Sequence, residues 1–206
     1  MVTIEQLQQL GASSFNSQKY IDGINETLDQ FEINTPARIC QFLAQCFHES
    51  GNLATITENL NYSAQRLMQV WPARYPNITI ANQFAHNPQA IANKNYGGRG
   101  GNNNDQDGWL FSGKGLIQLT FKSTYKKCGD AIGVDLISNP EALLDPRFAS
   151  LSAGWFWNQG SGIDLNTLAD LDSDDGFNNI TKRINGALGN IEQRRVLWSE
   201  AKDIFV

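Results

Sequence analysis

The chain has 206 residues, of which 41% are hydrophobic and 18% charged, a composition that favours one folded globular domain over extended disorder. Sixteen Lys and Arg residues against 21 Asp and Glu give a net charge of −5, which argues against nucleic acid as a partner, because phosphate backbones are bound mainly by basic residues. No apolar run approaches the roughly 20 residues that span a bilayer, so no membrane insertion is expected.

Helical signals dominate the first quarter of the chain. A capping-box pattern that begins at Thr3 predicts a helix from residue 4 onwards. Apolar residues recur at helical spacing over residues 17–31, which predicts a second helix. The pair Thr35-Pro36 is typical of a helix start, and Gly51 is typical of a helix end. A third helix is therefore predicted between them.

The middle of the chain combines short elements with an irregular segment. Helices are predicted over residues 63–71, where Pro72 ends the pattern, and over residues 87–93. Residues 95–107 are rich in Gly and Asn with almost no aliphatic side chain, which indicates a loop. Residues 116–120 form a brief apolar run bounded by glycines, and we expect a short strand there.

Helices are predicted again in the last third of the chain, over residues 145–157, 175–184 and 190–205. No repeat, linker or low-complexity tract interrupts the sequence. The coarse expectation is a helical body with a small strand and loop region.

Glu49 is the most informative single residue. It falls in the last turn of the third predicted helix, where the negative end of the helix dipole and apolar neighbours such as Phe47 both disfavour ionisation. Both effects raise the pKa of a carboxyl, and a carboxyl that holds its proton near neutral pH is what a general acid requires. The alternative is a solvated glutamate on the helix surface.

Glu58 is the only acidic residue in the segment 51–59, directly after that helix. Cleavage of a glycosidic bond needs an acid on the leaving oxygen and a second carboxylate on the other face of the sugar. Glu58 is the candidate for that second group, with a simple helix-flanking role as the alternative. The separation of the two carboxyls, which decides the stereochemistry, does not follow from sequence spacing.

The cysteines do not form a recognisable framework. Three are present, an odd number, and Cys40 and Cys46 lie six apart on one predicted helix. A disulfide framework is therefore not expected, and no metal-ligand spacing with the two histidines occurs. We expect neither a metal nor another cofactor.

Six short blocks carry a resemblance to a known family. In order, they are His48-Glu49-Ser50-Gly51, Glu58-Asn59-Leu60-Asn61-Tyr62-Ser63, Tyr96-Gly97-Gly98-Arg99, Asp107-Gly108-Trp109, Gly113-Lys114-Gly115-Leu116-Ile117-Gln118-Leu119-Thr120 and Arg183-Ile184-Asn185-Gly186. Together they resemble the family 19 glycoside hydrolases, which include chitinases and a compact group of bacteriophage endolysins. The chain is most similar to the compact group, over about residues 35 to 205.

The resemblance implies a mainly α (α+β, lysozyme-like) fold, with a bilobal helical body and a small strand and loop region flanking a substrate cleft. It implies one catalytic domain over residues 1–206 and an inverting mechanism. On the family pattern, Glu49 matches the general acid and Glu58 the base that activates water. Thr120 matches a hydroxyl that helps to hold that water, in keeping with the ability of a hydroxyl to accept and donate at once.

Five further residues are candidates for substrate contact. Tyr96, Gln118 and Asn185 match positions that contact the sugar or shape the cleft, and Arg194 matches an arginine that would order the carboxylates by bidentate pairing. Trp109, beside the glycine-rich loop, is a candidate for lining the cleft, whereas the other four tryptophans lie on helical apolar faces and are expected in the core. The alternatives are a loop anchor for Tyr96, satisfaction of backbone groups for Gln118 and a helix C-cap for Asn185.

The expected function is hydrolysis of the β-1,4 glycan backbone of bacterial peptidoglycan, as in an endolysin or muramidase-type lysozyme. A chitinase acting on N-acetylglucosamine polymers is the main alternative, and an exported antibacterial effector or a non-catalytic sugar-binding module are others. The acidic net charge departs from many endolysins, which are basic, and Lys114 stands where the family usually has Arg. We expect a monomer that is made in the cytoplasm without a signal peptide and reaches the cell wall after release or export.

Overall fold

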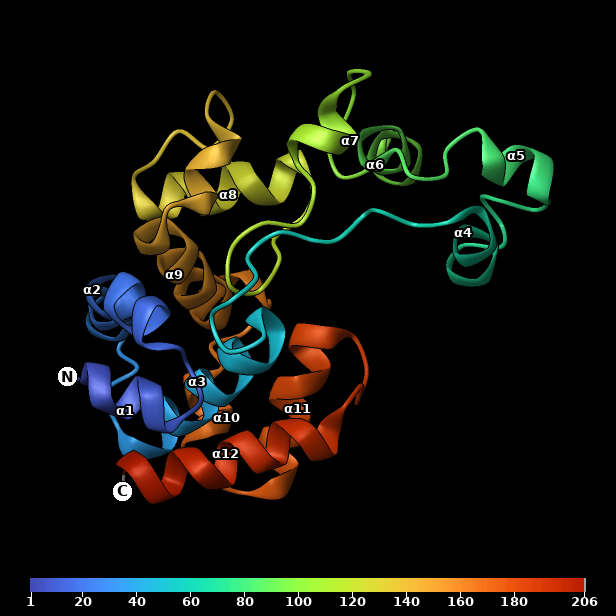
Figure 1. Ribbon diagram of the computed structural model, residues 1–206. Coiled ribbons are helices and arrows are strands. Elements are labelled where there is room, and N and C mark those ends of the chain that lie inside the picture. Colours follow the sequence, from blue (N-terminus) through green and yellow to red (C-terminus); the bar gives the residue numbers. More distant parts are fainter. Residues whose placement is uncertain (206) are drawn as a thin grey trace.

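The computed structural model describes residues 1–205, and regular structure within them is almost entirely helical (Figure 1). The mainly α, lysozyme-like fold expected from the sequence is confirmed. The α-helices are α1 (Ile4–Gln9), α2 (Ser14–Gln30), α3 (Pro36–Ser50), α4 (Ala64–Val70), α5 (Ile78–Asn82), α6 (Pro88–Tyr96), α7 (Asp107–Leu110), α8 (Lys122–Ile132), α9 (Pro146–Trp155), α10 (Asn166–Ala169), α11 (Asp174–Asn185) and α12 (Ile191–Phe205). A 3₁₀ segment, Pro140–Leu144, precedes α9, and a π-helical turn, Phe156–Gly160, follows it.

Capping residues place the helix ends where the sequence predicts them. The Thr35 hydroxyl accepts from the Arg38 amide at 3.3 Å at the start of α3, with Pro36 in the first helical position. Gly51 ends the same helix in the left-handed region at φ 55°, which glycine adopts without strain. Thr3 forms the expected capping box at the start of α1.

The body of the molecule is built around α3, which packs against α12 and α10, while α2 packs against α9. Most of the apolar face of α3 is buried, with Leu43 and Phe47 at 0% exposure. Three of the four tryptophans expected in the core are buried in this body, namely Trp155, Trp157 and Trp198. Burial of such large apolar surfaces fixes α3, and with it the position of Glu49 in its last turn.

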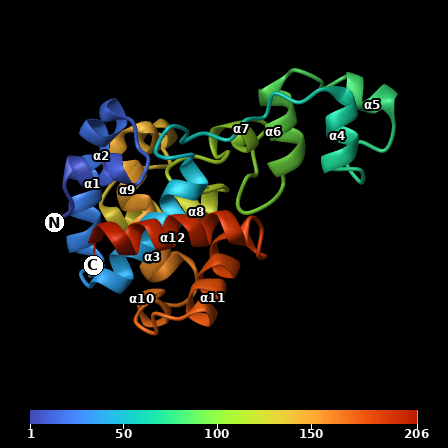
Figure 2. The same cartoon turned by 60° about the horizontal axis from the view of Figure 1, so that its bottom comes forward.

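A small lobe, defined as residues 59–104, projects from the body and carries α4, α5 and α6 (Figures 1 and 2). It has a hydrophobic cluster of its own, separate from the core of the body, and the fourth tryptophan, Trp71, packs against it. The members of this cluster are Leu60, Ala64, Leu67, Tyr75, Ala81, Ile91 and Ala92. The bilobal arrangement expected from the sequence therefore rests on two separate apolar clusters.

The expected strand over residues 116–120 is wrong. Lys114 makes isolated antiparallel bridges to Thr57 and Leu119, and no strand forms in the part of the chain that the structure describes. Gln118 and Phe121 have φ angles of 59° and 79°, which turn the backbone out of the extended conformation. The segment is a tight loop directly before α8, a helix that the sequence analysis missed.

Within residues 1–205, none of the helices combines the length and apolar character needed to cross a bilayer.

Candidate active site

Glu49 meets Arg194 at the end of α3. The Glu49 side chain is 20% exposed, and its Oε1 accepts a hydrogen bond from Nη2 of Arg194 on α12. Arg194 is 1% exposed, so its guanidinium is held inside the body. The pair joins residues 145 positions apart in the chain and fixes the direction in which the Glu49 carboxyl points.

The guanidinium of Arg194 is shared between three acceptors. Its Nη1 donates to Oε1 of Gln45 at 2.6 Å, and its Nε donates to the carbonyl oxygen of Gly189 at 3.1 Å. Gln45, fully buried, donates in turn to the hydroxyl of Thr181 on α11 at 2.8 Å. The bidentate pairing expected for Arg194 is therefore wrong, because the two ends of its fork bind two different side chains.

Gln45 is a site residue that the sequence analysis missed. It lies one helical turn before Glu49, so both side chains project from the same face of α3. An uncharged polar residue one helical turn before the candidate acid was the available signal.

Glu58 lies in the loop after α3 and is held by two donors. Its Oε1 accepts from the backbone amide of Gly113 at 2.6 Å, and its Oε2 accepts from the hydroxyl of Tyr96 at 2.7 Å. The Glu58 amide also donates to the Gly113 carbonyl at 3.0 Å. An ionised carboxylate is purely an acceptor, so both contacts suit the charged form that a general base requires.

Tyr96 is thus placed at the carboxylate. Burial, the negative charge of Glu58 and the hydrogen bond to it raise the pKa of the Tyr96 hydroxyl above its usual value of 10.0. The phenol keeps its proton across the working pH range and remains a donor to Glu58. This contact links α6 of the small lobe to the carboxylate.

Gly113 and Gln118 crowd against Glu58. A Cβ atom on residue 113 would lie 2.9 Å from Oε1 of Gln118 and 3.3 Å from Cβ of Glu58. The Gln118 oxygen is buried without a hydrogen-bond partner, although its Nε2 donates to the Gly115 carbonyl at 3.3 Å. A strained backbone and an unsatisfied buried oxygen beside a carboxylate are features that cluster at functional sites.

Thr120 follows in the same loop, and its hydroxyl donates to the Gln118 carbonyl at 3.2 Å. The proton of this hydroxyl is therefore engaged, and its oxygen still has lone pairs that can accept from water. Its role in holding the attacking water stays a prediction.

Two of the expected substrate contacts lie on short or terminal segments. Trp109, on α7, is 39% exposed, and α7 packs against α6 of the small lobe. Asn185 is exposed at the last position of α11, directly before Gly186, which caps the helix with φ 76°. The C-cap is therefore Gly186 and not Asn185, the alternative considered for that residue. Sugar contacts at Trp109 and Asn185 stay predictions.

Lys114 supports the loop that carries Gly113. Its Nζ donates to the Leu110 carbonyl at 2.9 Å and lies 3.3 Å from a carboxylate oxygen of Glu141. Burial lowers the pKa of this ammonium, partly offset by Glu141 and Glu58. A compact ammonium therefore occupies the position where the family usually has a guanidinium.

The site residues form two hydrogen-bonded sets, one around Glu49 and one around Glu58, which the segment 51–57 connects. The first belongs to the helical body, through α3, α11 and α12, and the second joins the loop 113–120 to the small lobe. That Glu49 and Glu58 face each other across a substrate cleft stays a prediction.

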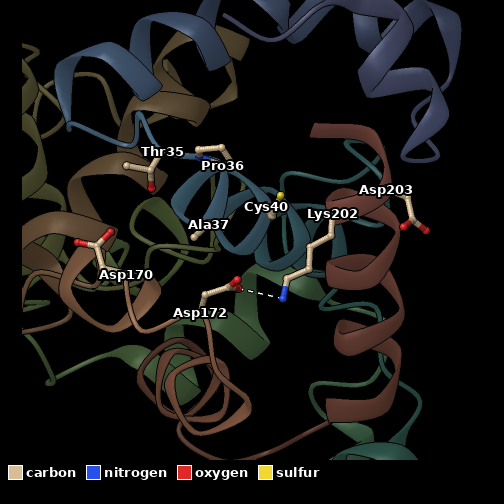
Figure 3. Close-up of a pocket in the computed structure, with 8 residues that line it drawn as sticks. All are labelled: Thr35, Pro36, Ala37, Cys40, Asp170, Asp172, Lys202 and Asp203. Atoms are coloured by element: carbon tan, nitrogen blue, oxygen red, sulfur yellow. Dashed lines mark ion pairs between the residues drawn. The ribbon is translucent and has the colours of Figure 1, made fainter. Parts of the chain in front are cut away.

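A cavity of about 880 Å³ lies elsewhere in the body. It is formed by the first residues of α3, the segment 170–172 and the end of α12, with Cys40 in its wall and Lys202 paired to Asp172 at 2.9 Å (Figure 3). Cys40 and Glu49 are nine residues apart on one helix, which separates them by about 14 Å along its axis. The cavity lining includes none of the predicted site residues.

Among residues 1–205, no cluster of three or more His, Cys, Asp or Glu side chains has the arrangement of a metal site. All three cysteines are free and buried. The hydrogen-bonded sets around Glu49 and Glu58 consist of carboxyl, hydroxyl, amide and guanidinium groups.

Comparison with known proteins agrees with this chemistry. The family model for glycoside hydrolase family 19, described as chitinase class I, matches residues 32–164. A glycosyl hydrolase family 19 domain-containing protein of Haemophilus influenzae is 37% identical over 160 residues, which cover 76% of this chain and 74% of that protein. Endochitinase 1 of Theobroma cacao is 49% identical over 51 residues, which cover 24% of this chain and only 16% of the plant protein.

Solved structures show the same fold. Chitinase C from Streptomyces griseus HUT6037 matches with a TM-score of 0.64 and 23% identity, covering 99% of this chain and 76% of that one. A bacterial family 19 chitinase matches with the same TM-score and 25% identity, covering 99% of this chain and 94% of that one.

The lysozyme-like helical fold and the family match together define a glycosidase. The chain belongs to glycoside hydrolase family 19.

Proposed function

We propose that this protein hydrolyses the β-1,4 glycan backbone of bacterial peptidoglycan by inverting general acid/base catalysis. The observation that carries the proposal is that both carboxyl groups are held in fixed orientations: Glu49 by the guanidinium of Arg194, and Glu58 by a backbone amide and a phenol. Glycoside hydrolysis needs two such carboxyls, one that donates a proton and one that accepts a proton.

In this mechanism Glu49 gives its proton to the leaving glycosidic oxygen as the bond to the anomeric carbon breaks. Glu58 takes a proton from a water molecule, whose oxygen attacks the anomeric carbon from the opposite face. Thr120 accepts from that water and so orients it. After one turnover Glu49 is ionised and Glu58 protonated, and proton exchange with solvent restores the starting state.

Peptidoglycan is the preferred substrate in this proposal for two reasons. The sequence blocks are most similar to the compact endolysins, and a bacterial relative matches three quarters of the chain, whereas the plant endochitinase matches over 51 residues. We further propose a monomer that acts on the cell wall after release or export.

Chitin is the second candidate, and a specific observation favours it. Two solved structures that share this fold over 99% of the chain are chitinases. A chitin chain offers the same β-1,4 linkage and the same N-acetyl groups but carries no carboxylates.

The deciding experiment is digestion of purified bacterial sacculi and of colloidal chitin in parallel. Borohydride reduction followed by mass spectrometry identifies the sugar at each new reducing end. Reduced muramic acid at the new ends of sacculi supports the proposal. If sacculi stay intact and chitin is degraded, the protein is a chitinase. Intact sacculi and intact chitin, with tight binding of either, support a non-catalytic module.

The acid assignment has its own test. Glu49→Gln keeps the shape of the side chain but has no proton to transfer, so turnover should fall by at least about a hundredfold. Glu200→Gln, the same change at an exposed position of α12, is the matched control and should retain full activity. Full turnover in Glu49→Gln rejects Glu49 as the acid.

A further inference from the structure

Charge is distributed very unevenly between the two lobes. The 46 residues of the small lobe include four basic residues, Arg66, Arg74, Lys94 and Arg99, and no Asp or Glu. An even spread of the 21 acidic residues of the chain would place about five in a segment of this length. The remainder of the chain holds 12 basic against 21 acidic residues, so an acidic protein carries a lobe with a formal charge of +4.

The small lobe owes its polar surface mainly to amide side chains. Ten Asn and four Gln residues occur between positions 59 and 104, so amides take the surface positions that carboxylates would otherwise occupy. An amide keeps the surface soluble without cancelling the positive charge of its neighbours.

The basic residues of the small lobe have no acidic partners. Within residues 1–205, eight of the 12 basic residues outside the lobe form ion pairs, and none of the four inside it does. Their charge is therefore available to a partner from outside the chain.

Three of these residues lie together at the end of α6. Arg74 donates from Nη1 to the carbonyl of Lys94 at 2.8 Å, and Arg99 donates from Nη1 to the next carbonyl, that of Asn95, at 3.3 Å. The two guanidiniums thus cap the negative end of the helix. Each uses one N–H for the cap, and a guanidinium has five, so most donors of both residues remain free.

Arg99 also connects this cluster to the carboxylate of Glu58. Its guanidinium carbon lies 5.3 Å from the ring centroid of Phe121, and that ring contacts the ring of Tyr96 edge-on at 5.6 Å. The hydroxyl of Tyr96 is the donor to Glu58. The basic end of α6 is therefore separated from the candidate base by two aromatic rings.

The acidic groups that border the cluster do not neutralise it. Asp105 is exposed, and Glu58 is bound by Gly113 and Tyr96. Asp107 is already paired with Lys122 at 3.2 Å.

We propose that the acid-free small lobe is a docking surface for carboxylate groups carried by the glycan, so that the enzyme selects an anionic polymer over a neutral one. This inference rests on the proposed glycosidase function and specifies its substrate class. Peptidoglycan fits because its peptide stems bear carboxylates, whereas chitin has none. Arg66 and Arg99, both exposed, are the contacts most open to such a polymer.

Binding of sacculi and their cleavage must be measured in separate assays. Sedimentation on ice with purified sacculi measures binding, for the wild type and for Arg66→Gln/Arg99→Gln, and sugar release at 37 °C measures hydrolysis. The double variant should bind sacculi about fivefold more weakly, because each exposed charge contact adds a modest amount to affinity. Wild-type binding should also weaken as salt is raised, while binding of both proteins to colloidal chitin should be equal.

Two controls isolate the effect of the lobe. Lys19→Gln/Lys127→Gln removes the same charge from exposed, unpaired positions of the body and should bind sacculi like the wild type. Arg66→Lys/Arg99→Lys keeps the charge and should restore most of the binding. Thermal unfolding of each variant confirms that it is folded.

Equal losses in the lobe and body variants overturn the inference, as does undiminished binding of the wild type to sacculi whose carboxyls have been converted to amides. Failure of the proposed function gives a different result. In that case the wild type releases no sugar from sacculi, whether or not it binds them.

Discussion

Gly113→Ala tests whether the loop before α8 positions the candidate base. The added Cβ would lie 2.9 Å from Oε1 of Gln118, closer than a carbon and an oxygen approach without a bond, and 3.3 and 3.4 Å from two carbons of Glu58. Gly113 does not have a positive φ, so alanine brings no backbone strain of its own. The whole effect must come from displacing Glu58 or Gln118 by a few tenths of an ångström.

The expected result is a large loss of turnover with a small loss of stability. Displacement of the Glu58 carboxylate disturbs its hydrogen bonds to the Gly113 amide and to Tyr96, and misplacement by a fraction of an ångström to 1 Å costs about ten- to a hundredfold in rate. Overpacking of this kind costs about 1–3 kcal/mol of unfolding free energy. The assay is the initial rate of sugar release at 25 °C, with urea unfolding of the same preparations.

Gly133→Ala is the matched control. Nothing lies within 4 Å of a Cβ at that position, and its φ of 72° makes alanine cost about 1–2 kcal/mol in the left-handed region. Gly133→Ala should therefore lose about as much stability as Gly113→Ala but keep full activity. Wild-type turnover in Gly113→Ala, or equal rate losses in both variants, would show that the contact of Gly113 with Glu58 does not set the rate.

Three further results are expected. Tyr96→Phe removes one donor from Glu58 and should lower kcat/KM about tenfold with little change in Tm; an unaltered rate contradicts a positioning role for the phenol. Burial raises the pKa of Asp107, but the amides of the preceding loop and Lys122 outweigh it, so the net pKa lies below 3.8. Its ionisation therefore stabilises the fold above about pH 4, and the advantage over Asp107→Asn in urea unfolding should be full at pH 6 and shrink as pH falls towards 3. A thiol reagent at pH 8 should label none of the cysteines in the folded chain and three after denaturation, because burial raises every thiol pKa, to about 11 for Cys40 and about 12 for Cys128, and in the same direction for Cys46.

Helix ends were readable from the sequence because their determinants are local. The hydroxyl of Thr35 caps a backbone amide three residues away, and Gly51 ends the same helix by its own conformational freedom. The apolar spacing between these two residues was enough to place Glu49 in the last turn. Such signals act within one or two turns, so no knowledge of the tertiary structure was needed.

Elements without local caps were missed. Helix α8 begins after Phe121, which has φ 79° and provides no side-chain hydrogen bond, so the sequence contains no start signal. The short apolar run before α8 is typical of a strand, but a strand needs an extended partner segment to pair with. The positive φ of Gln118 turns the chain out of the extended conformation instead. Whether such a run pairs is decided by what packs beside it.

For the candidate site, the sequence by itself determined which residues carry chemistry: the blocks around Glu49 and Glu58 and the family to which they belong. Only the tertiary structure decided which groups those carboxyls meet. Arg194 reaches Glu49 and Gln45 across 145 and 149 positions, and Tyr96 reaches Glu58 across 38. Contacts at such separations depend on how whole helices pack, and helix packing is set by the sum of many buried apolar contacts, which no short stretch of sequence contains.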